Sequence, residues 1–500
     1  MITRRRLLSG APISGAASAL SMSAAFSEAP APWRRCSEGE SIGLEEGWHF
    51  RLDPRGAVSP SDMTEASAGW QSVTVPHTWQ ALGGSPETVG VAWYRTKIFA
   101  PENWRNLFVR VEFEAVYHTA HIFLNGTPIG EHIGKGYTAF SCDLSPHLLY
   151  AEANELQVRV DNSFSDTMLP RMKSFDWAND GGITRPVRLL ITPPVFIERL
   201  EIDAVPDLES NVAHICVCAV IRNTRTSAQA ANISASVRYN GTAAREYAGP
   251  STVVNLPPES STRVSAGRIQ IEAPELWHFD APHLYWAETV LDVSGQFHSM
   301  GDRFGIRKFE IRGTSFYLNG ERVSLMGVER MAGSHPQFGM AEPTEWIDAN
   351  HRDLKELNCV FTRVHWPQDK RVLDFCDSHG ILMQEEVPAW GPFTFDKIAA
   401  ELQSQLEANG QEQLREMVER DRNHPCIVSW GLCNEVNGKN PNSRAFAHTL
   451  AQLARKIDPS RLLTYASHTL GEHPEQDMAG DFDFISANEY FGSWYPGGVE

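Results

Sequence analysis

The N-terminal part of the chain alternates apolar and polar residues with a period of two. Val109 and Val111, for example, stand on either side of Arg110, as expected when one face of a strand packs on a core and the other meets water. The same pattern predicts strands at residues 93–99, 107–114, 120–124, 156–160 and 187–191, separated by turns such as Asn125-Gly126. We interpret residues 40–193 as an antiparallel, jelly-roll-like β-sandwich.

A second β-rich region follows over residues 194–313. Its clearest predicted strands are residues 214–221, 233–239 and 286–293, and its predicted polar connections are residues 223–231 and 255–262. A region of roughly 100 residues with short strands at this spacing is typical of an immunoglobulin-like β-sandwich.

After about residue 316 the pattern changes to strands that alternate with helices. Strands are predicted at residues 323–328, 359–364, 381–385, 426–430, 462–466 and 482–487, and helices at 345–357, 370–378, 401–420 and 444–457. This repetition predicts parallel β/α units and therefore a (β/α)8 TIM barrel over residues 314–500, with functional groups at the C-terminal ends of its strands. Because six strands are predicted where a closed barrel has eight, we expect this barrel to be truncated after strand six.

Composition and charge exclude some classes of partner. The chain has 62 acidic and 44 basic residues, a formal net charge of −18, which argues against binding to nucleic acid or to an anionic membrane surface. The 14 tryptophans suit either sugar stacking or core packing. The eight cysteines form no CxxC pair and no zinc-type spacing, so neither a metal site nor a disulfide framework is predicted.

The N-terminus resembles an export signal. Arg4, Arg5 and Arg6 precede a weakly apolar stretch rich in Ala and Ser, which is typical of a twin-arginine signal. We predict that residues 1–31 are this signal and that the mature protein is periplasmic or secreted, with no membrane attachment after the signal is removed. A disordered basic tail is the alternative.

One segment carries a specific chemical signal. The apolar strand predicted at residues 426–430 leads into Asn434-Glu435, which would place an amide and a carboxyl at the mouth of the barrel. A glycosidase needs a carboxylic acid that protonates the leaving oxygen and later deprotonates water. A neighbouring amide can bond the sugar 2-hydroxyl. Taken alone, the pair would also fit a solvated strand end followed by a turn.

The whole segment from Asp421 to Glu435 resembles the acid/base motif of glycoside hydrolase family 2, which includes β-galactosidases, β-glucuronidases and β-mannosidases. The resemblance implies that Glu435 is the general acid/base of a retaining mechanism and that Asn434 contacts the 2-hydroxyl. It implies a nucleophilic Glu on the next strand, beyond residue 500. The strand-end carboxylates Glu385, Glu386 and Glu489 do not match that position. The 500-residue chain alone is therefore expected to be inactive.

Other segments extend the resemblance. Residues 70–79, 123–140 and 176–187 resemble motifs of the family's sandwich domain, and Asp176 resembles an acidic residue that reaches the sugar pocket. An aspartate that stabilises a turn is the alternative for Asp176. His365-Trp366-Pro367 resembles the family's His-Tyr-Pro, so His365 is a candidate donor to a sugar hydroxyl, with a helix-capping or packing role as the alternative. Arg363 stands two residues before His365, where three is usual, and we give it less weight.

The segment after residue 487 resembles the family's sixth-strand region. Here the resemblance assigns Asn488 and Tyr490 to the reaction centre and makes Trp494 a candidate sugar platform. Core packing is the alternative for the aromatic residues. Trp366 and Trp390 are further candidates for an aromatic sugar pocket.

Two departures from the family pattern stand out. The first barrel strand leads to Gly327-Val-Glu-Arg-Met331, where Gly-Val-Asn-Arg-His is usual, and His335 follows four residues later. Trp390 and Pro392 stand near the position where some β-galactosidases have a magnesium site, and neither residue supplies a ligand. We therefore predict no metal and no cofactor.

Together these features predict a retaining β-glycosidase that hydrolyses terminal β-linked sugars of an oligosaccharide or glycoside, with β-galactosidase-like specificity favoured. β-Glucuronidase or β-mannosidase specificity is the alternative within the family. A carbohydrate-binding protein without turnover is the alternative from another class. The sequence also leaves a homo-oligomer open as the assembly of this protein.

Overall fold

The computed structural model describes residues 39–56, 58–59, 69–81, 88–171, 178–239, 241 and 244–490, all within the compact unit Arg34–Glu500. The predicted export signal, Asp176 and Trp494 lie outside the described residues. Within these ranges, no helix combines the length and the apolar character that crossing a bilayer requires.

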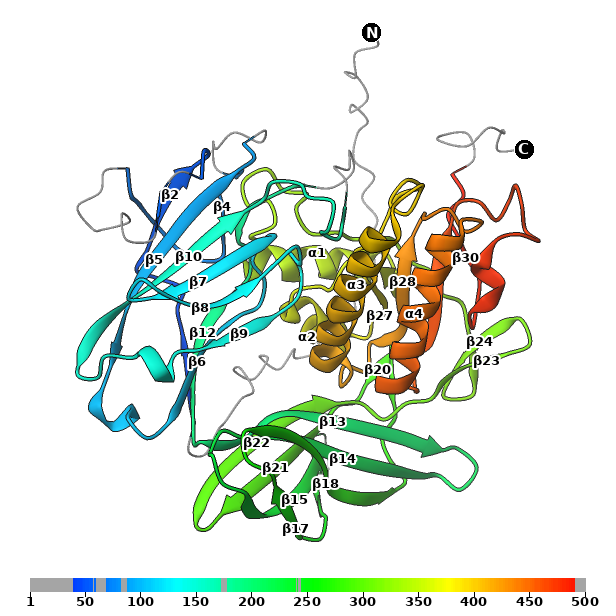
Figure 1. Ribbon diagram of the computed structural model, residues 1–500. Coiled ribbons are helices and arrows are strands. Elements are labelled where there is room, and N and C mark those ends of the chain that lie inside the picture. Colours follow the sequence, from blue (N-terminus) through cyan, green and yellow to red (C-terminus); the bar gives the residue numbers. More distant parts are fainter. Residues whose placement is uncertain are drawn as a thin grey trace, which may run out of the picture. The chain divides into compact units, whose positions relative to one another are not determined.

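The N-terminal region is an antiparallel β-sandwich (Figure 1). One sheet has the order β1 (Glu40–Gly43), β12 (Val187–Thr192), β6 (Phe108–Phe113) and β9 (Phe140–Asp143). The other has the order β3 (Gln71–Val73), β2 (Trp48–Asp53), β5 (Val91–Ala100), β10 (Glu152–Asp161), β7 (Thr119–Leu124) and β8 (Thr127–His132). Inward-facing residues of both sheets, such as Val111 and Val158, share one core. The alternation in the sequence therefore predicted this sandwich correctly.

The second region contains two further antiparallel sheets. The first has the order β13 (Val195–Asp207), β14 (Val212–Asn223) and β18 (Ser260–Glu272). The second has the order β16 (Arg245–Ala248), β15 (Gln229–Tyr239), β21 (Tyr285–Val293) and β22 (Gln296–Phe304), with β17 (Thr252–Leu256) also paired to β15. The predicted polar connections were too long, because the strands extend into them with polar residues on their exposed faces.

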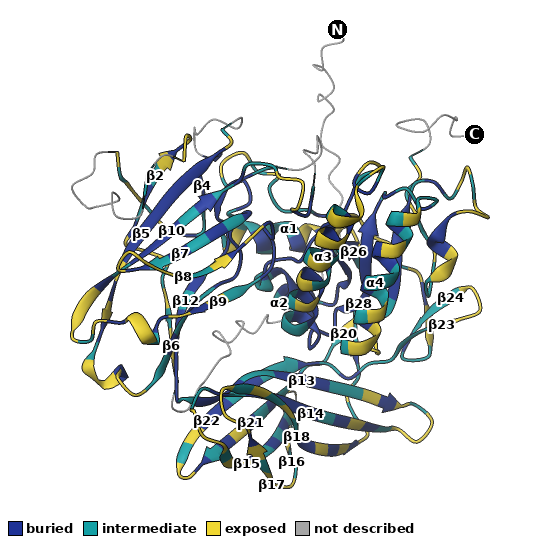
Figure 2. Ribbon diagram, viewed as in Figure 1, coloured by how far each residue is buried: buried dark blue, intermediate teal, exposed yellow. Residues whose placement is uncertain are grey.

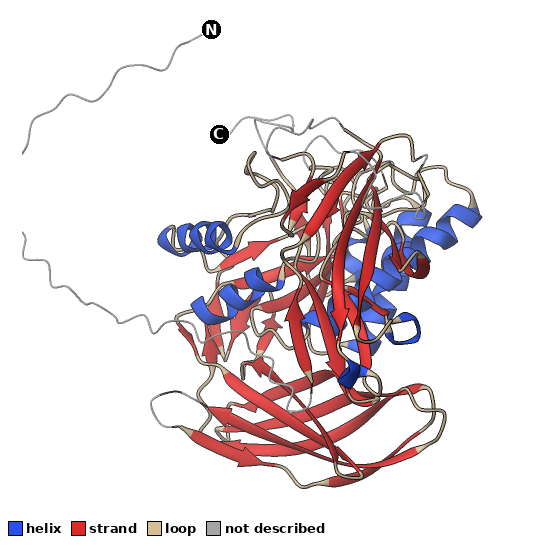
Figure 3. Cartoon of the chain, turned by 90° about the vertical axis from the view of Figure 1, so that its left-hand side faces the viewer, coloured by secondary structure: helices blue, strands red, loops and turns tan. Residues whose placement is uncertain are grey.

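The C-terminal region has a parallel sheet whose strand order follows the sequence. Its strands are β26 (Phe361–Arg363), β27 (Leu382–Glu386), β28 (Ile427–Asn434), β29 (Leu462–Ser467) and β30 (Ser486–Ala487). The α-helices in the described residues are α1 (Thr344–Glu356), α2 (Lys370–His379), α3 (Ala400–Asp421) and α4 (Pro441–Ile457). Figure 3 shows these helices among the strands. Sequential parallel strands with intervening helices form the half-barrel part of a (β/α)8 architecture.

Burial explains why this part of the sequence lacks simple alternation. Every residue of β27 and β28 is buried (Figure 2), as is usual for parallel strands that are covered on both faces. The helices instead bury one face, and in α4 this face contains Phe446, Leu450 and Ala454. Gly380 follows α2 with φ of 72°, in agreement with the predicted helix end.

The predicted first barrel strand at residues 323–328 was wrong for most of its length. β25 (Glu321–Val323) instead pairs antiparallel with β24 (Ser315–Leu318), which also pairs with β23 (Phe309–Arg312). Gly327 reaches the parallel sheet through a bridge to Phe361, and the carbonyl oxygens of the neighbouring Met326 and Val328 accept hydrogen bonds from Val360 and Thr362. A Cβ at position 327 would lie 1.6 Å from the Phe361 carbonyl oxygen, so this approach requires glycine. A short apolar segment predicts a strand, but it does not reveal which neighbouring strand it pairs with or to which sheet that strand belongs.

The remaining described elements are short. They are β4 (His77–Thr78) paired with β11 (Gly182–Ile183), β19 (Trp277–His278) paired with β20 (Ala281–Pro282), and the 3-10 helices η2 (Glu102–Trp104), η3 (Ser145–His147) and η4 (Met478–Asp481). Continuation of the half-barrel into a closed barrel stays a prediction.

Candidate active site

Polar residues converge where the parallel strands end. Arg363, Glu386 and Asn434 are the last residues of β26, β27 and β28, and Asn488 follows β30 directly. Because parallel strands in sequential order end at one edge of the sheet, these four side chains meet there. Hydrogen bonds connect Arg363 to each of the other three.

Glu435 projects from a strained turn at this edge. It follows β28 with φ of 52°, a conformation that non-glycine residues seldom adopt and that concentrates at functional sites. Its backbone N–H donates to the Ala466 carbonyl of β29 at 2.8 Å. Its Oε1 accepts a hydrogen bond from Nδ2 of Asn488 at 2.9 Å. The carboxyl is partly exposed, so it is oriented and remains accessible.

The amide of Asn434 has a defined orientation. Its Oδ1 accepts one hydrogen bond from Nη2 of Arg363 and one from Nδ2 of Asn488, both at 2.8 Å. Its backbone is held by Ala389 and Gly391. Since both neighbours donate to the oxygen, the nitrogen is the remaining polar atom, and no acceptor for it occurs among the described residues. This side chain can therefore donate to a ligand.

Arg363 is the centre of this network. Its guanidinium donates to both oxygens of Glu386, at 3.2–3.3 Å, and to Oε1 of Glu329 at 2.9 Å. Burial lowers the pKa of Arg363, but Glu386 and Glu329 more than compensate and raise it above its ordinary value. Glu386 is completely buried, and this burial raises its pKa although Arg363 opposes the shift.

Sequence reasoning underestimated two of these residues. Arg363 was given less weight because its spacing to His365 departs from the family pattern. Glu329 was not selected, although it stands where the pattern Gly-Val-Asn-Arg-His has Asn. That replacement of an amide by a carboxyl was the available signal. In the structure, Glu329 is the second carboxylate bound to Arg363.

His365 and the two candidate tryptophans lie together near this edge. Burial, and then the charge of Arg363, lower the pKa of His365 to about 3, so its imidazole is neutral at pH 7. Its ring makes an edge contact with Trp390, with centroids 6.4 Å apart. Trp390 is also joined to Asn434 by a backbone bridge. A neutral imidazole beside an aromatic ring suits contact with a sugar hydroxyl.

Trp366 occupies a different environment from the one expected. Its ring is 1% exposed and stacks on Tyr137 of the N-terminal sandwich, with centroids 4.9 Å apart. Trp390, Tyr117 and Met340 belong to the same buried cluster. The stacked face of Trp366 is covered by protein, so this indole packs the junction between two regions and does not present a sugar platform.

The other predicted positions are distributed as follows. Tyr490, the last described residue, is partly buried and interacts electrostatically with Arg363. Met331, which replaces the family His, packs against the aromatic cluster. His335 packs against Phe338 and Trp346, with ring centroids 4.6 and 4.5 Å away. The ring contacts of His335 are thus with its own loop and α1.

The N-terminal half of the motif that ends at Glu435 has a different role. Asn423 bonds Leu200 and Ile202 of β13 and Asp302 of β22, and Arg422 forms an ion pair with Asp203 at 2.9 Å. These residues therefore join the half-barrel to the immunoglobulin-like region. Part of the motif is structural, although it appears in the sequence as one catalytic signature.

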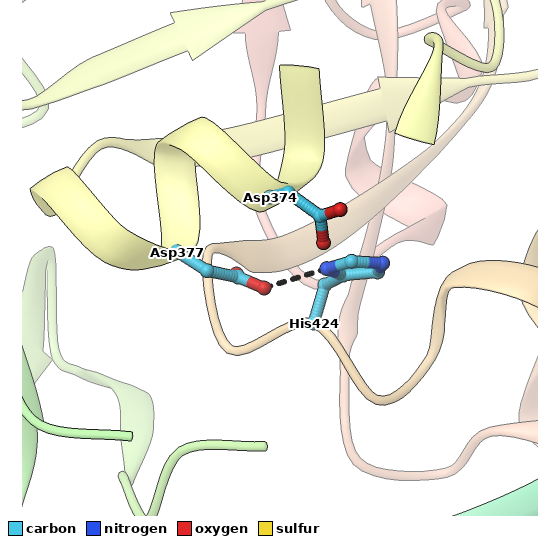
Figure 4. Close-up of side chains that lie close together, drawn as sticks. All are labelled: Asp374, Asp377 and His424. Atoms are coloured by element: carbon cyan, nitrogen blue, oxygen red, sulfur yellow. Dashed lines mark hydrogen bonds and ion pairs between the residues drawn. The ribbon is translucent and has the colours of Figure 1, made fainter. Parts of the chain in front are cut away.

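Asp374, Asp377 and His424 form a cluster of possible metal ligands, with ligand atoms within 4.8 Å of one another (Figure 4). However, Asp377 accepts hydrogen bonds from His424 Nδ1 at 2.6 Å and from the Cys426 N–H at 3.1 Å. Nη2 of Arg303 lies 2.5 Å from Oδ1 of Asp374. A guanidinium already balances these carboxylates, so the cluster is an ion-pair network.

Comparison with known proteins gives a consistent result over almost the whole chain. Sequence models match for the sugar binding domain of glycosyl hydrolases family 2 over residues 28–193, for glycosyl hydrolases family 2 over 195–307, and for the family's TIM barrel domain over 309–498.

Individual relatives share 30% or less of their sequence with this chain in the three comparisons that follow. A putative beta-glucuronidase of Formosa agariphila is 30% identical over 426 residues, which cover 81% of this chain and 48% of the relative. A beta-galactosidase of Thermoanaerobacterium thermosulfurigenes is 28% identical over 438 residues, with coverages of 84% and 57%. The crystal structure of a Bacteroides uniformis beta-glucuronidase superposes with a TM-score of 0.81 at 26% identity, covering 92% of this chain and 56% of that one. The chain thus spans about half the length of these relatives.

Proposed function

Since this chain belongs to glycoside hydrolase family 2, we propose that it has the function of a retaining β-glycosidase, with Glu435 as general acid/base. The observation that supports this most directly is the placement of the Glu435 carboxyl. It lies at the C-terminal end of a buried parallel strand, is oriented by Asn488, and remains accessible.

In the proposed reaction, Glu435 first donates its proton to the leaving glycosidic oxygen while a second carboxylate attacks the anomeric carbon. Glu435 then removes a proton from water, which hydrolyses the glycosyl–enzyme ester. Nδ2 of Asn434 donates to the sugar 2-hydroxyl, and this hydrogen bond strengthens as positive charge develops on the sugar ring.

The proposed nucleophile follows from the family resemblance alone and belongs to a strand after β30. Glu385 and Glu386 are unsuitable because both are completely buried. Glu386 has both oxygens bound by Arg363, and Oε1 of Glu385 accepts the Gln368 N–H at 2.6 Å. Neither carboxylate can reach an anomeric carbon without breaking these bonds.

For the sugar, we propose a neutral hexoside, with β-galactosides as the first class to test. The relatives' names divide between beta-galactosidase and beta-glucuronidase. Arg363 is the cation at the centre of the network, and Glu386 and Glu329 already balance its charge. A uronate would have to compete with these carboxylates, whereas a neutral hydroxyl would not. β-Glucuronides are the second candidate class.

From residues 1–31, which resemble a twin-arginine signal, we also propose export to the periplasm or medium.

The test is hydrolysis of a panel of aryl β-glycosides by the full-length protein, beside Glu435→Gln. We expect one neutral glycoside to be hydrolysed with retention of anomeric configuration, and the variant to lose about 10²–10⁴-fold in kcat. Glu472→Gln, which changes an exposed carboxyl in the loop after β29, serves as the matched control and should retain parental activity.

Other outcomes would point elsewhere. Full turnover by Glu435→Gln would show that another carboxyl is the acid/base. Inversion of configuration would exclude double displacement. Glycan binding without hydrolysis of any aryl glycoside would favour a carbohydrate-binding protein, and faster hydrolysis of glucuronides would replace the galactoside assignment.

A further inference from the structure

One buried arginine of the N-terminal sandwich binds the loop that carries His365. Arg185 is 4% exposed. Its Nη1 donates to the carbonyl oxygens of Tyr137 and Gln368, at 2.9 and 3.0 Å, and its Nη2 donates to the Pro367 carbonyl at 2.5 Å. Two of these three acceptors belong to the loop between β26 and α2. They are the carbonyls of Pro367 and Gln368, which stand two and three residues after His365.

The position of Arg185 is itself firmly fixed. It follows β11, which pairs with β4, and the neighbouring Thr184 N–H donates to the Ala115 carbonyl. A Cβ at Gly181 would lie 2.0 Å from the Trp79 ring, so glycine permits this close approach. The guanidinium therefore projects from a rigid part of the sandwich.

The loop is held equally firmly from the side of the half-barrel. Gln368 donates its N–H to Glu385 at 2.6 Å and its side-chain amide to the Trp366 carbonyl at 2.9 Å. Arg420 of α3 donates to the Gln368 carbonyl at 2.6 Å. Asp369 then caps α2 by accepting the Arg371 N–H. From the sandwich, Arg185 adds its hydrogen bonds to this set of contacts, beside the stacking of Tyr137 on Trp366.

Burying the charged guanidinium of Arg185 costs free energy. Burial and the nearby Arg420 lower the pKa of Arg185 to about 10, while Asp369, Glu385 and Asp421 oppose the shift. The three hydrogen bonds that Arg185 donates all go to main-chain carbonyls and not to a carboxylate. A guanidinium can satisfy several fixed acceptors at once because its donors are planar and rigid, which a lysine cannot do.

We infer that Arg185 is a positioning residue through which the N-terminal sandwich sets the geometry of the His365 loop and thereby of the sugar site. The catalytic consequence rests on the proposed function. The clamp, by which we mean the three hydrogen bonds from Arg185 to main-chain carbonyls, does not depend on it. Arg185 acts through main-chain atoms and, being buried, does not touch the substrate.

The test compares Arg185→Gln and Arg185→Lys with Arg303→Gln in the full-length protein. Arg303 also joins another region to the half-barrel, through Asp374 of α2, and lies outside the His365 loop. Hydrogen exchange is measured for peptides that cover residues 364–369, together with kcat and KM on the aryl glycoside that the substrate panel identifies. We expect at least tenfold faster exchange in this loop for Arg185→Gln, a smaller increase for Arg185→Lys, and none for Arg303→Gln.

For kinetics, we expect kcat/KM to fall about 10–100-fold in Arg185→Gln, since displacement of about 1 Å in a positioning group costs this much. Unchanged loop exchange in both Arg185 variants would overturn the clamp even if hydrolysis is normal. Faster exchange with unchanged kcat/KM would overturn its link to the sugar site. If no glycoside is hydrolysed at all, the proposed function fails, and the exchange measurement still decides the clamp. If Arg185→Gln does not fold, Arg185→Lys provides the same two measurements.

Discussion

At the scale of single residues, each polar atom around Glu435 has a restricted role because its partners are fixed. Asn488 donates to both Asn434 and Glu435, and Arg363 donates to Asn434. Donors therefore converge on the oxygens, and the nitrogen of Asn434 is the donor left for a substrate. This assignment follows from the surrounding donors, and it leads to a specific prediction.

Asn434→Asp keeps the acceptor for Arg363 and Asn488 but removes the donor for the sugar 2-hydroxyl. We expect kcat/KM for an ordinary aryl β-glycoside to fall about 10–100-fold, while the corresponding 2-deoxy glycoside reacts with a similar kcat/KM in both proteins. Comparing the two substrates cancels any effect of the new charge. An equal loss on both substrates would show that Asn434 does not contact the 2-hydroxyl.

Glu329 offers a second prediction at this scale. It contributes negative charge beside Arg363, and removing that charge should make a uronide less unfavourable. For Glu329→Gln, we expect the ratio of kcat/KM for glucuronide to that for galactoside to rise roughly fivefold, equivalent to about 1 kcal/mol. Glu321→Gln in β25 is the control. A ratio unchanged from that of the parent would remove Glu329 from the determinants of specificity.

At the scale of elements, α3 does more than cover the parallel sheet. Its residue Glu416 accepts hydrogen bonds from Lys135 at 2.7 Å and from Thr138 at 2.5 Å, and lies 3.3 Å from His132. All three partners belong to the N-terminal sandwich. Burial would raise the pKa of Glu416, but His132 and Lys135 outweigh it and lower this pKa below its ordinary value.

Replacing Glu416 by Gln should therefore destabilise the protein at neutral pH, by about 1–3 kcal/mol, because His132 loses its carboxylate and Lys135 keeps only the more exposed Glu412. A lowered pKa stabilises the folded state above the ordinary value of about 4.3, and this contribution disappears as the pH falls through the folded value. The difference in unfolding free energy between parent and variant should thus shrink below about pH 4.5. Denaturant titrations at several pH values measure it.

Glu412→Gln is the matched control for this experiment. Glu412 stands one turn earlier on α3 and also pairs with Lys135, at 2.9 Å, but its side chain is 60% exposed. Exposed pairs contribute at most about 1 kcal/mol. A loss as large as that of Glu416→Gln would show that total charge, and not the buried contact, stabilises this junction.

At the scale of the whole molecule, residues of one catalytic motif also join two regions. Asn423 accepts the Ile202 N–H at 2.9 Å and donates to Leu200 and Asp302 at 2.8 Å. The immunoglobulin-like region is therefore bound a few residues before β28, the strand that leads to Glu435. Its folding and the integrity of the half-barrel are expected to be coupled.

Asn423→Ala should weaken this coupling at a cost of about 1–3 kcal/mol, because buried backbone groups of β13 lose their partners while the Arg422–Asp203 and Arg303–Asp374 contacts remain. In calorimetry, we expect the immunoglobulin-like region to unfold in a separate, earlier transition. Asn409→Ala, which removes contacts of α3 with the sandwich carbonyls of Gly134 and Thr167, should not produce that transition. A single transition with an unchanged midpoint in Asn423→Ala would show that Asn423 does not contribute to the coupling.

The sequence by itself determined the order of the three regions, most strands and all four α-helices of the described part. Local periodicity was sufficient because it reports which face of an element is buried. Resemblance to the family's motifs also selected Asn434, Glu435, Asn488 and His365, which lie at or just after the strand ends that the β/α pattern predicts. A motif at a strand end places its residues through the fold's general topology, without knowledge of distant contacts.

The tertiary structure alone decided what depends on distant partners. In the structure, β25 pairs with β24 in an antiparallel sheet, and Arg363 is the centre of the hydrogen-bond network. The ring of Trp366 is covered by Tyr137. The tertiary structure also brought Arg185 to a loop about 180 residues away. Nothing in the local pattern around these residues encodes the partner, because hydrogen bonds and ring contacts between regions arise only when separately predictable elements pack together.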